Sequence, residues 1–298
     1  MTENISDRNG RALEYSIVKH LFTRYKVKLT PQAIKDQGRD EHKFDELPLK
    51  LKKIFIDSSV KIGGWLSENW EINGNILLDR LGDDKAKEGD VTDIRLIFPD
   101  KSRINLSIKH NHDAVKHQRP GALAQQCGFP KKSTIDKEYR LAFRNVKELF
   151  LCDADKINPN AITFNDLRNV DSDFIFKSLY NPVCNLVEDF INEHCNDEEH
   201  SKHLFCFLVG TINFYKVIVT KELVKILAFS DIPLPKSVTA TQTSDHYVDL
   251  LFSNEWKFSM RLHTASSGIS GVSLKFDTRA ANAPIPTAAQ LFHQEIIL

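Results

Sequence analysis

Two neighbouring segments of alternating residues, separated by a turn, constrain the fold of this 298-residue chain more than any other feature. Residues 91–98 are rich in β-branched and apolar side chains, and residues 103–109 alternate between apolar and polar positions. Pro99 and Asp100 lie between them, which is typical of a tight turn. The pattern predicts a β-hairpin with one face in a hydrophobic core.

The period of a strand decides which side chains share a face of this hairpin, because successive side chains point to opposite faces. With the apolar positions in the core, Asp93, Ser107 and Lys109 meet on the polar face. A carboxylate can hold Mg²⁺, which polarises a phosphate and acidifies a bound water, and an ammonium group can stabilise the transition state. The pair therefore suits phosphodiester hydrolysis, although a salt bridge without a catalytic role explains the same two residues.

The distribution of charge is more informative than its sum. Lys and Arg together number 40, as do Asp and Glu, so the chain is not basic overall, as a nonspecific DNA-coating protein would be. Between residues 101 and 145, however, ten Lys or Arg outnumber three Asp or Glu. Such a segment can form a defined contact with a polyanion, or simply a solvated face.

Composition indicates a globular protein that is not bound to a membrane. Hydrophobic residues make up 41% and charged residues 27% of the chain. No apolar run approaches the roughly 20 residues that cross a bilayer, and the N-terminus does not resemble a signal peptide. We therefore expect a cytoplasmic protein.

The five cysteines are an odd number without a Cys-x-x-Cys pair, which favours reduced thiols. Cys195, His200, His203 and Cys206 are all capable of binding zinc. Their spacing matches none of the common zinc frameworks, so a polar turn is favoured over a metal site there.

The remaining chain mixes predicted helices and strands without a linker long enough to require separate domains. Helices are expected at residues 7–26, at 48–80 with breaks at Gly63-Gly64 and Asn73-Gly74, and at 171–193. Helix or loop is expected at 113–127 and 135–148, and strands at 148–152, 204–209, 215–219, 247–251, 257–262 and 272–276. The fold class is therefore α/β, as one domain over residues 1–298.

Several strings resemble a known family of nucleases. Asp93, followed after thirteen residues by Ser107-Ile-Lys109, resembles the PD-(D/E)xK nuclease motif. Three longer strings are similar to the HaeIII-type family of restriction endonucleases: Gly89–Arg95 (GDVTDIR), Leu106–Arg119 (LSIKHNHDAVKHQR) and Gly10–Tyr15 (GRALEY). Two further strings resemble a segment that lies late in the sequences of several restriction enzymes: Phe258–Ser267 (FSMRLHTASS) and Ser273–Asp277 (SLKFD).

The resemblance implies a PD-(D/E)xK nuclease-like core with a mixed central sheet flanked by helices and a β-rich C-terminal extension. It places a catalytic core at about residues 1–152 and a DNA-recognition region at about 153–298. The implied activity is that of a Type II restriction endonuclease, which uses Mg²⁺ to cut double-stranded DNA at a short site, GGCC or a related sequence. A cognate DNA methyltransferase is implied as the partner of the system, and a palindromic site would favour a homodimer.

One position departs from the motif. Ser107 stands where the motif has an acidic residue, and a hydroxyl is a poorer ligand for Mg²⁺ than a carboxylate. The resemblance suggests Glu14, on the N-terminal helix, as the compensating carboxylate, although it can instead be a surface residue paired with Lys or Arg. The predicted catalytic residues are thus Asp93, Lys109, Ser107 and Glu14, and the predicted metal ligands are Asp93, Glu14 and Asp90, the last in a supporting position.

Polar residues after Lys109 and near the C-terminus are candidates for DNA contacts, to phosphates or to base edges. Any single one can instead be an exposed polar residue of a strand. The predicted set is Asn111, His112, Lys116, His117, Arg119, Arg261, His263, Ser266, Ser267 and Lys275.

Two other functions fit the same residues. The first is a repair, resolvase or modification-dependent nuclease built on the same core. The second is a DNA-binding protein whose nuclease site has decayed, as Ser107 in place of an acid suggests.

Overall fold

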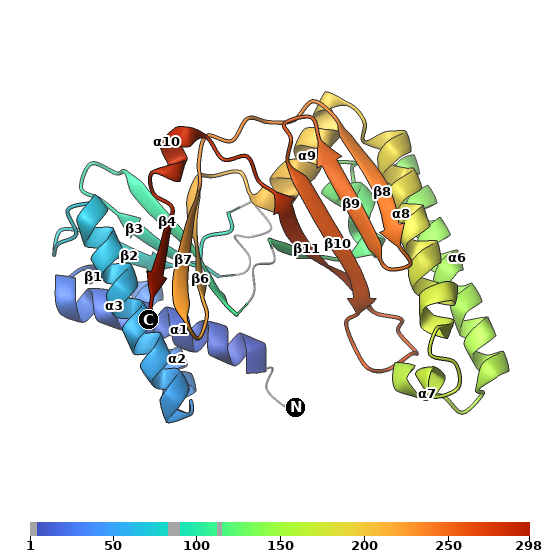
Figure 1. Ribbon diagram of the computed structural model, residues 1–298, viewed down its shortest axis with the longest axis horizontal. Coiled ribbons are helices and arrows are strands. Elements are labelled where there is room, and N and C mark those ends of the chain that lie inside the picture. The colour runs from blue at the N-terminus through green and yellow to red at the C-terminus, as the bar shows by residue number, and fades with distance from the viewer. Residues whose placement is uncertain (1–4, 83–89, 112–114) are drawn as a thin grey trace. The chain divides into compact units, whose positions relative to one another are not determined.

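The computed structural model describes residues 5–82, 90–111 and 115–298 (Figure 1). The chain divides into two compact units. Unit 1 comprises Met1–Asp113, Gly210–Ile232 and Ile285–Leu298, and unit 2 comprises Ala114–Val209 and Pro233–Pro284. Both units are therefore assembled from segments that lie far apart in the sequence.

Unit 1 is built on a seven-stranded sheet with the order β1-β2-β3-β4-β6-β7-β12. β1 pairs with β2 and β4 with β6 in parallel, whereas the other neighbours are antiparallel, so the sheet is mixed. The strands are β1 (Lys28–Leu29), β2 (Leu77–Arg80), β3 (Ile94–Ile97), β4 (Arg103–His110), β6 (Phe214–Val219), β7 (Leu223–Phe229) and β12 (Gln294–Ile297).

Three long helices flank this sheet and bury its apolar face (Figure 1). They are α1 (Ile5–Tyr25), α2 (Pro31–Asp45) and α3 (Leu49–Asn69), and a short helix α10 (Thr287–Gln290) precedes β12. The predicted helix at residues 7–26 is confirmed as α1, in which Leu13, Ile17 and Leu21 recur at four-residue spacing and are all fully buried. α1 packs against β4, which brings the N-terminal helix to the predicted hairpin.

The predicted hairpin is confirmed as the antiparallel pair β3–β4. Ile94 lies opposite Leu106 and Leu96 lies opposite Ile104, and all four side chains are buried in the core under the helices. The other face of the hairpin is therefore the polar face that the strand period predicts.

A network of buried ion pairs ties α1 and α2 to the sheet. The Arg80 guanidinium, of which only 2% is exposed, lies 2.5 Å from Glu14 Oε2 and 3.0 Å from Asp40 Oδ2. Burial raises the pKa of Asp40, but the hydrogen bond from Arg39 and the charge of Arg80 outweigh it and hold this pKa below its ordinary value. Glu14 is thus fixed by a strand residue rather than exposed on the helix surface.

Unit 2 contains a five-stranded antiparallel sheet with the order β5-β11-β10-β9-β8. Its strands are β5 (Lys116–Gln118), β8 (Val238–Ser244), β9 (Tyr247–Phe252), β10 (Lys257–Thr264) and β11 (Leu274–Asn282). Its helical elements are η1 (Pro120–Ala122), α5 (Leu123–Gln126), α6 (Thr134–Ile157), α7 (Phe164–Arg168), the π-helical turn η2 (Phe176–Tyr180), α8 (Asn181–His194) and α9 (Glu198–Val209). The predicted strands near the C-terminus are confirmed.

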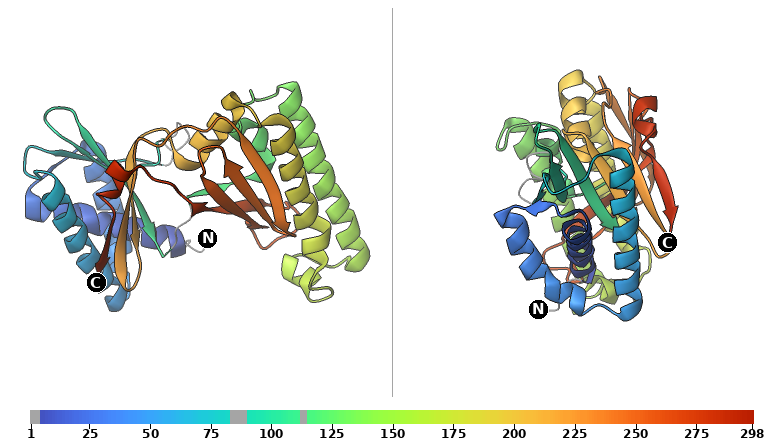
Figure 2. Two further views of the ribbon diagram at one scale, coloured as in Figure 1. Left: turned by 45° about the horizontal axis from the view of Figure 1, so that its top comes forward. Right: turned by 90° about the vertical axis from the view of Figure 1, so that its left-hand side faces the viewer.

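Helices cover one face of this second sheet. α8 packs against β8 and β9, and α6 runs beside α8 (Figure 2). Phe205 of α9 makes ring contacts with Phe252, Trp256 and Phe258 of the sheet. The alternating burial of β10 and β11 follows from this arrangement, because only one face of each strand is apolar.

Two predicted strands are wrong. Residues 148–152 belong to α6 and residues 204–209 to α9. Short apolar runs of this length fit a buried strand and a buried stretch of helix equally well, so their periodicity does not separate the two.

The predicted break at Gly63-Gly64 is also wrong, since α3 continues through both glycines. A Cβ atom at Gly63 would lie 2.8 Å from the ring of His20 on α1. The glycine therefore permits a close approach of two helices instead of ending one.

The expected boundary near residue 152 differs from the observed units, because Gly210–Ile232 and Ile285–Leu298 return to unit 1. The single restriction-endonuclease-like domain over residues 1–298 stays a prediction. Among the residues that the structure describes, no helix combines the length and apolar composition needed to cross a membrane.

We expect Arg80→Ala to lower the free energy of unfolding by about 3–5 kcal/mol, because it leaves buried carboxylates without their counter-charge. Urea denaturation measures this. The control is Arg144→Ala, whose partner Glu148 is 3.7 Å away in an exposed pair, and which should cost no more than about 1 kcal/mol. Equal small losses in both variants would contradict the structural role of Arg80.

Candidate active site

Asp93 is the centre of a polar cluster at the start of the hairpin. Its Oδ2 atom accepts a hydrogen bond from the backbone N–H of Ile108 at 2.6 Å. The Ser107 hydroxyl and the Lys109 ammonium each lie 3.4 Å from the same oxygen. About a quarter of each of the Asp93 and Lys109 side chains is exposed, so a solvent-borne ligand can reach them. The structure thus brings together the three residues that the strand period predicts on one face.

Glu14 of α1 is electrostatically joined to this cluster. Burial and then the negative charge of Asp93 raise the pKa of Glu14 to about 7, against the opposing effect of Arg80. The Asp93 carboxylate, which is paired with Lys109, is therefore close enough to Glu14 to affect its ionisation. The surface-pair explanation of Glu14 does not fit, because its partner Arg80 is a buried residue of β2.

These carboxylates fit a hard divalent cation. Mg²⁺ in proteins is commonly held by one or two carboxylates together with waters and substrate phosphates. Burial is the largest cause of the raised pKa of Glu14 and the negative charge of Asp93 is the second, and a bound cation would favour the charged form of this carboxylate. Asp93 and Glu14 are the two residues that would hold the ion.

In the part of the chain that the structure describes, no metal site is made entirely of protein ligands. Within residues 5–82, 90–111 and 115–298, no three His, Cys, Asp or Glu side chains converge as a metal site. This includes the zinc-capable set between Cys195 and Cys206, where His200 instead forms an ion pair with Asp197 at 2.8 Å.

Asp90 is occupied by other partners. Its Oδ2 atom lies 2.5 Å from Arg95 Nη2, and its Oδ1 atom accepts the Thr92 N–H at 3.1 Å. Burial raises the pKa of Asp90, but the hydrogen bonds from Thr92 and Arg95 outweigh it and lower this pKa overall. No described contact joins Asp90 to Asp93, so its role as a metal ligand stays a prediction.

Sequence reasoning missed Lys216. This residue of β6 lies opposite Ser107 in the parallel ladder, and it is 4% exposed. Directly opposed residues of paired strands share a face, so Lys216 belongs to the polar face of the hairpin. The only signal in the sequence is a lysine within an otherwise apolar strand, and nothing local relates it to residues more than 100 positions earlier.

The predicted DNA-contacting residues fall into several places. Asn111 follows β4 in unit 1, exposed and with a φ of 58°. His112 lies outside the described residues. The others belong to unit 2, and three of them share one partner: His117 Nδ1, Arg261 Nη2 and His263 Nε2 lie 2.6, 3.0 and 3.2 Å from the carboxylate of Asp277.

Two basic candidates have structural partners. Lys116 shares the helix-covered face of the second sheet, and its ammonium lies 4.8 Å from the centre of the Phe207 ring. Arg119 Nη1 lies 3.1 Å from the Ser273 hydroxyl and 3.3 Å from the Leu274 carbonyl oxygen. Lys275 lies opposite His263 on β11. Contacts of these residues with DNA stay predictions.

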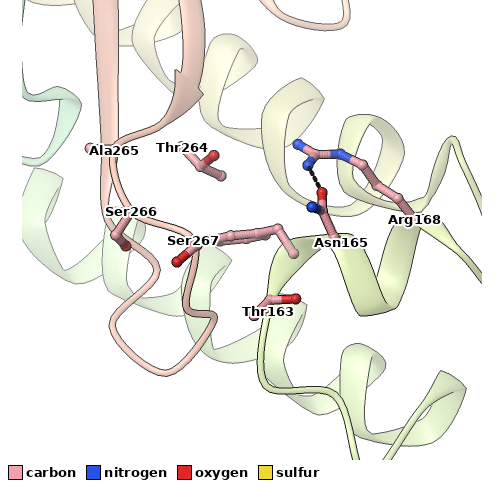
Figure 3. A pocket seen from close by; sticks show the side chains of 8 residues that line it. Thr163, Asn165, Arg168, Thr264, Ala265, Ser266 and Ser267 are labelled. Atoms are coloured by element: carbon pink, nitrogen blue, oxygen red, sulfur yellow. Dashed lines mark hydrogen bonds between the residues drawn. The ribbon is translucent and has the colours of Figure 1, made fainter. Parts of the chain in front are cut away.

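Ser266 and Ser267 line a pocket of about 350 Å³ after β10 (Figure 3). Asn165 and Arg168 of α7 lie on its other side, joined by a hydrogen bond of 2.9 Å. The Phe164 N–H donates to the Ser267 carbonyl oxygen at 2.9 Å, which ties the loop to the helix. The loop that carries these two exposed serines is therefore tied to α7 through its backbone.

A mixed sheet whose hairpin presents an Asp and a Lys beside a helix-borne Glu has the features of a metal-dependent nuclease site. The sequence model of the HaeIII restriction endonuclease family matches residues 10–232. The chain therefore belongs to the HaeIII restriction endonuclease family, which confirms the predicted family and the enzyme class of site-specific deoxyribonuclease.

One characterised relative is similar over almost the whole chain. The Type II restriction enzyme HaeIII of Haemophilus aegyptius is 27% identical over 321 aligned residues, which cover 94% of this chain and 96% of that enzyme. No solved structure matches the chain significantly.

We expect Asp93→Ala to be less stable than Asp93→Asn by about 1–3 kcal/mol, because only Ala leaves the buried Ile108 N–H without an acceptor. Both substitutions remove the same charge, so their difference isolates the hydrogen bond. Urea denaturation of the two variants measures it. Equal stabilities would show that this bond does not hold the hairpin.

Proposed function

We propose that this protein is a Type II restriction endonuclease that hydrolyses double-stranded DNA at a short specific site with Mg²⁺, through a PD-(D/E)xK-like hairpin. The observation that carries the proposal is Asp93 Oδ2 at 3.4 Å from Lys109 Nζ, beside Glu14. Membership of the family and the likeness to the enzyme from Haemophilus aegyptius support it. The resemblance suggests GGCC or a related sequence as the site.

Each residue of the cluster has a separate task. Asp93 and Glu14 bind the ion, whose role is to polarise the scissile phosphate and to lower the pKa of a water. Lys109 orients the attacking water or stabilises the charge that develops on the phosphate. Ser107, which replaces the acid of the motif, donates its hydroxyl to Asp93 and so orients that carboxylate. Asp90 supports the segment before β3 through Arg95 and Thr92.

DNA is held by residues outside this cluster. Asn111 and His112 bind phosphate or position water next to Lys109. Contacts with the DNA backbone and base edges come from Lys116, His117, Arg119, Arg261, His263, Ser266, Ser267 and Lys275. The enzyme acts in the cytoplasm, on a palindromic site as a homodimer, and a cognate methyltransferase protects the DNA of the host.

The first test is a digest. Phage DNA with Mg²⁺ should give discrete fragments, and Lys109→Ala and Asp93→Asn should each lower the single-turnover rate at least about 100-fold, because each removes charge at the reacting phosphate. DNA affinity should stay within a few-fold of the unmodified protein. The control is Lys225→Ala, an exposed residue of β7 paired with Glu295 at 2.9 Å, which should cut normally. Normal cutting by either site variant would sink the proposed mechanism.

The second test concerns the ion. We expect Glu14→Gln to weaken binding of Ca²⁺ or Mg²⁺ at least about tenfold, since carboxylates are preferred ligands. Isothermal titration calorimetry without DNA measures this independently of cleavage. Asp90→Asn is the control and should change the affinity less, because that carboxylate is engaged by Arg95 and Thr92. The opposite order would assign the metal to Asp90.

The digest also separates the alternatives. A decayed nuclease, which Ser107 favours, would bind DNA without cutting it. A repair, resolvase or modification-dependent nuclease would cut only branched or modified DNA.

A further inference from the structure

The sheet of unit 2 has one face that the helices do not cover. Phe258, Met260 and Leu262 of β10 are fully or almost fully buried toward the helices. Arg261 and His263 alternate with them and therefore lie on the opposite face. We refer to this opposite side of β5, β9, β10 and β11 as the polar face of the sheet.

The polar face has an excess of positive charge. Its strands carry Arg261, Lys275 and Arg279 with the carboxylate of Asp277, and the imidazoles of His117 and His263 add charge when protonated. The other acid on this face, Asp249, is paired with Lys257 at 2.9 Å. Such a face complements the phosphates of DNA.

Asp277 lies at the centre of this face. In the sheet register it stands between Arg261 on β10 and His117 on β5. Its carboxylate lies within 3.2 Å of three side chains from these two strands, His117, Arg261 and His263. Only 19% of Asp277 is exposed, whereas 47% of Arg261 is, so the acid anchors a cation that reaches solvent.

Arg261 contacts Asp277 through a single nitrogen, Nη2. A guanidinium has five N–H groups in a rigid fork, so further donors face outward from the sheet. Arginine is the side chain most often found in bidentate contact with guanine, whose N7 and O6 atoms accept hydrogen bonds in the major groove. A guanidinium that a carboxylate already holds in place loses less conformational entropy when it binds the edge of a guanine.

We propose that Arg261 is a specificity-determining residue that reads a guanine of the DNA site in the major groove, and that Asp277 is the residue that positions it. This inference rests on the proposed function, because it needs a defined DNA site. It assigns recognition to the polar face of the second sheet, and it assigns to Asp277 a role that needs no contact with DNA.

The test begins with the cleavage site, obtained by sequencing fragment ends. Duplexes are then made in which each guanine in turn is replaced by 7-deazaguanine, which lacks the N7 acceptor. Binding is measured with Ca²⁺ in place of Mg²⁺. We expect one replacement to weaken binding by the unmodified protein about 10- to 100-fold, and Arg261→Ala to lose a similar factor and to become insensitive to that replacement. Arg261→Lys, which keeps the charge but not the fork, should behave like Arg261→Ala.

Asp277→Asn tests the positioning role against a matched control. Asp249→Asn removes a carboxylate of similar exposure, 17%, from the same face of the same sheet. We expect Asp277→Asn to lower discrimination between cognate and non-cognate duplexes at least about fivefold, through a weaker affinity for the cognate duplex. Asp249→Asn should leave discrimination unchanged. Equal effects of the two variants would remove the positioning role.

Other outcomes overturn the assignment of Arg261. If the Arg261 variants weaken binding to every duplex equally, and if the salt dependence of their binding constant falls by the amount expected for one phosphate contact, then Arg261 binds the DNA backbone. A cleavage site without guanine, or an undiminished 7-deazaguanine effect in Arg261→Ala, would also exclude it. In these cases specific cutting persists and the proposed function stands, whereas absence of any specific cutting removes both.

Discussion

The hydrogen bond from the Ile108 N–H to the Asp93 carboxylate is the contact on which the candidate active site depends. It joins Asp93, the residue before β3, to Ile108 of β4. The register of the hairpin therefore also fixes the position of the Asp93 carboxylate. Because Ser107 and Lys109 flank Ile108 and share the other face of the strand, the same bond directs Asp93 toward both. The core side of the hairpin, with Ile94 opposite Leu106, prevents the one-residue slip that would turn these polar groups inward.

The ionic groups near this hydrogen bond balance one another's charge. Glu14 is partly buried next to Asp93, which is unfavourable for two carboxylates. Arg80 compensates the charge of Glu14 on the helix side of the sheet, and Lys109 compensates the charge of Asp93 on the polar face of the hairpin. Asp40 in turn is paired with both Arg80 and Arg39, so the charges on the helix side balance one another.

The parts that the sequence predicted are local, and the parts that it did not are contacts between distant segments. The hairpin and the shared face of Asp93, Ser107 and Lys109 follow from a period of two over nineteen residues. Glu14 came only from resemblance, since no local pattern relates a helix to a strand 80 residues later. The sequence did not predict the place of Lys216, because only the parallel pairing of β4 with β6, two strands far apart in the chain, brings it beside Ser107. The runs at 148–152 and 204–209 were misassigned because an apolar run this short does not separate a helical period from a strand.

One of the strings that resemble the family contributes residues to both units. Leu106–Arg119 begins in β4, at the polar cluster of unit 1, and continues through β5, the edge strand of the sheet in unit 2. It therefore contributes Lys109 to one unit and His117, a partner of Asp277, to the other. A substitution within this string is therefore assigned to one unit by its strand, β4 for Lys109 and β5 for His117.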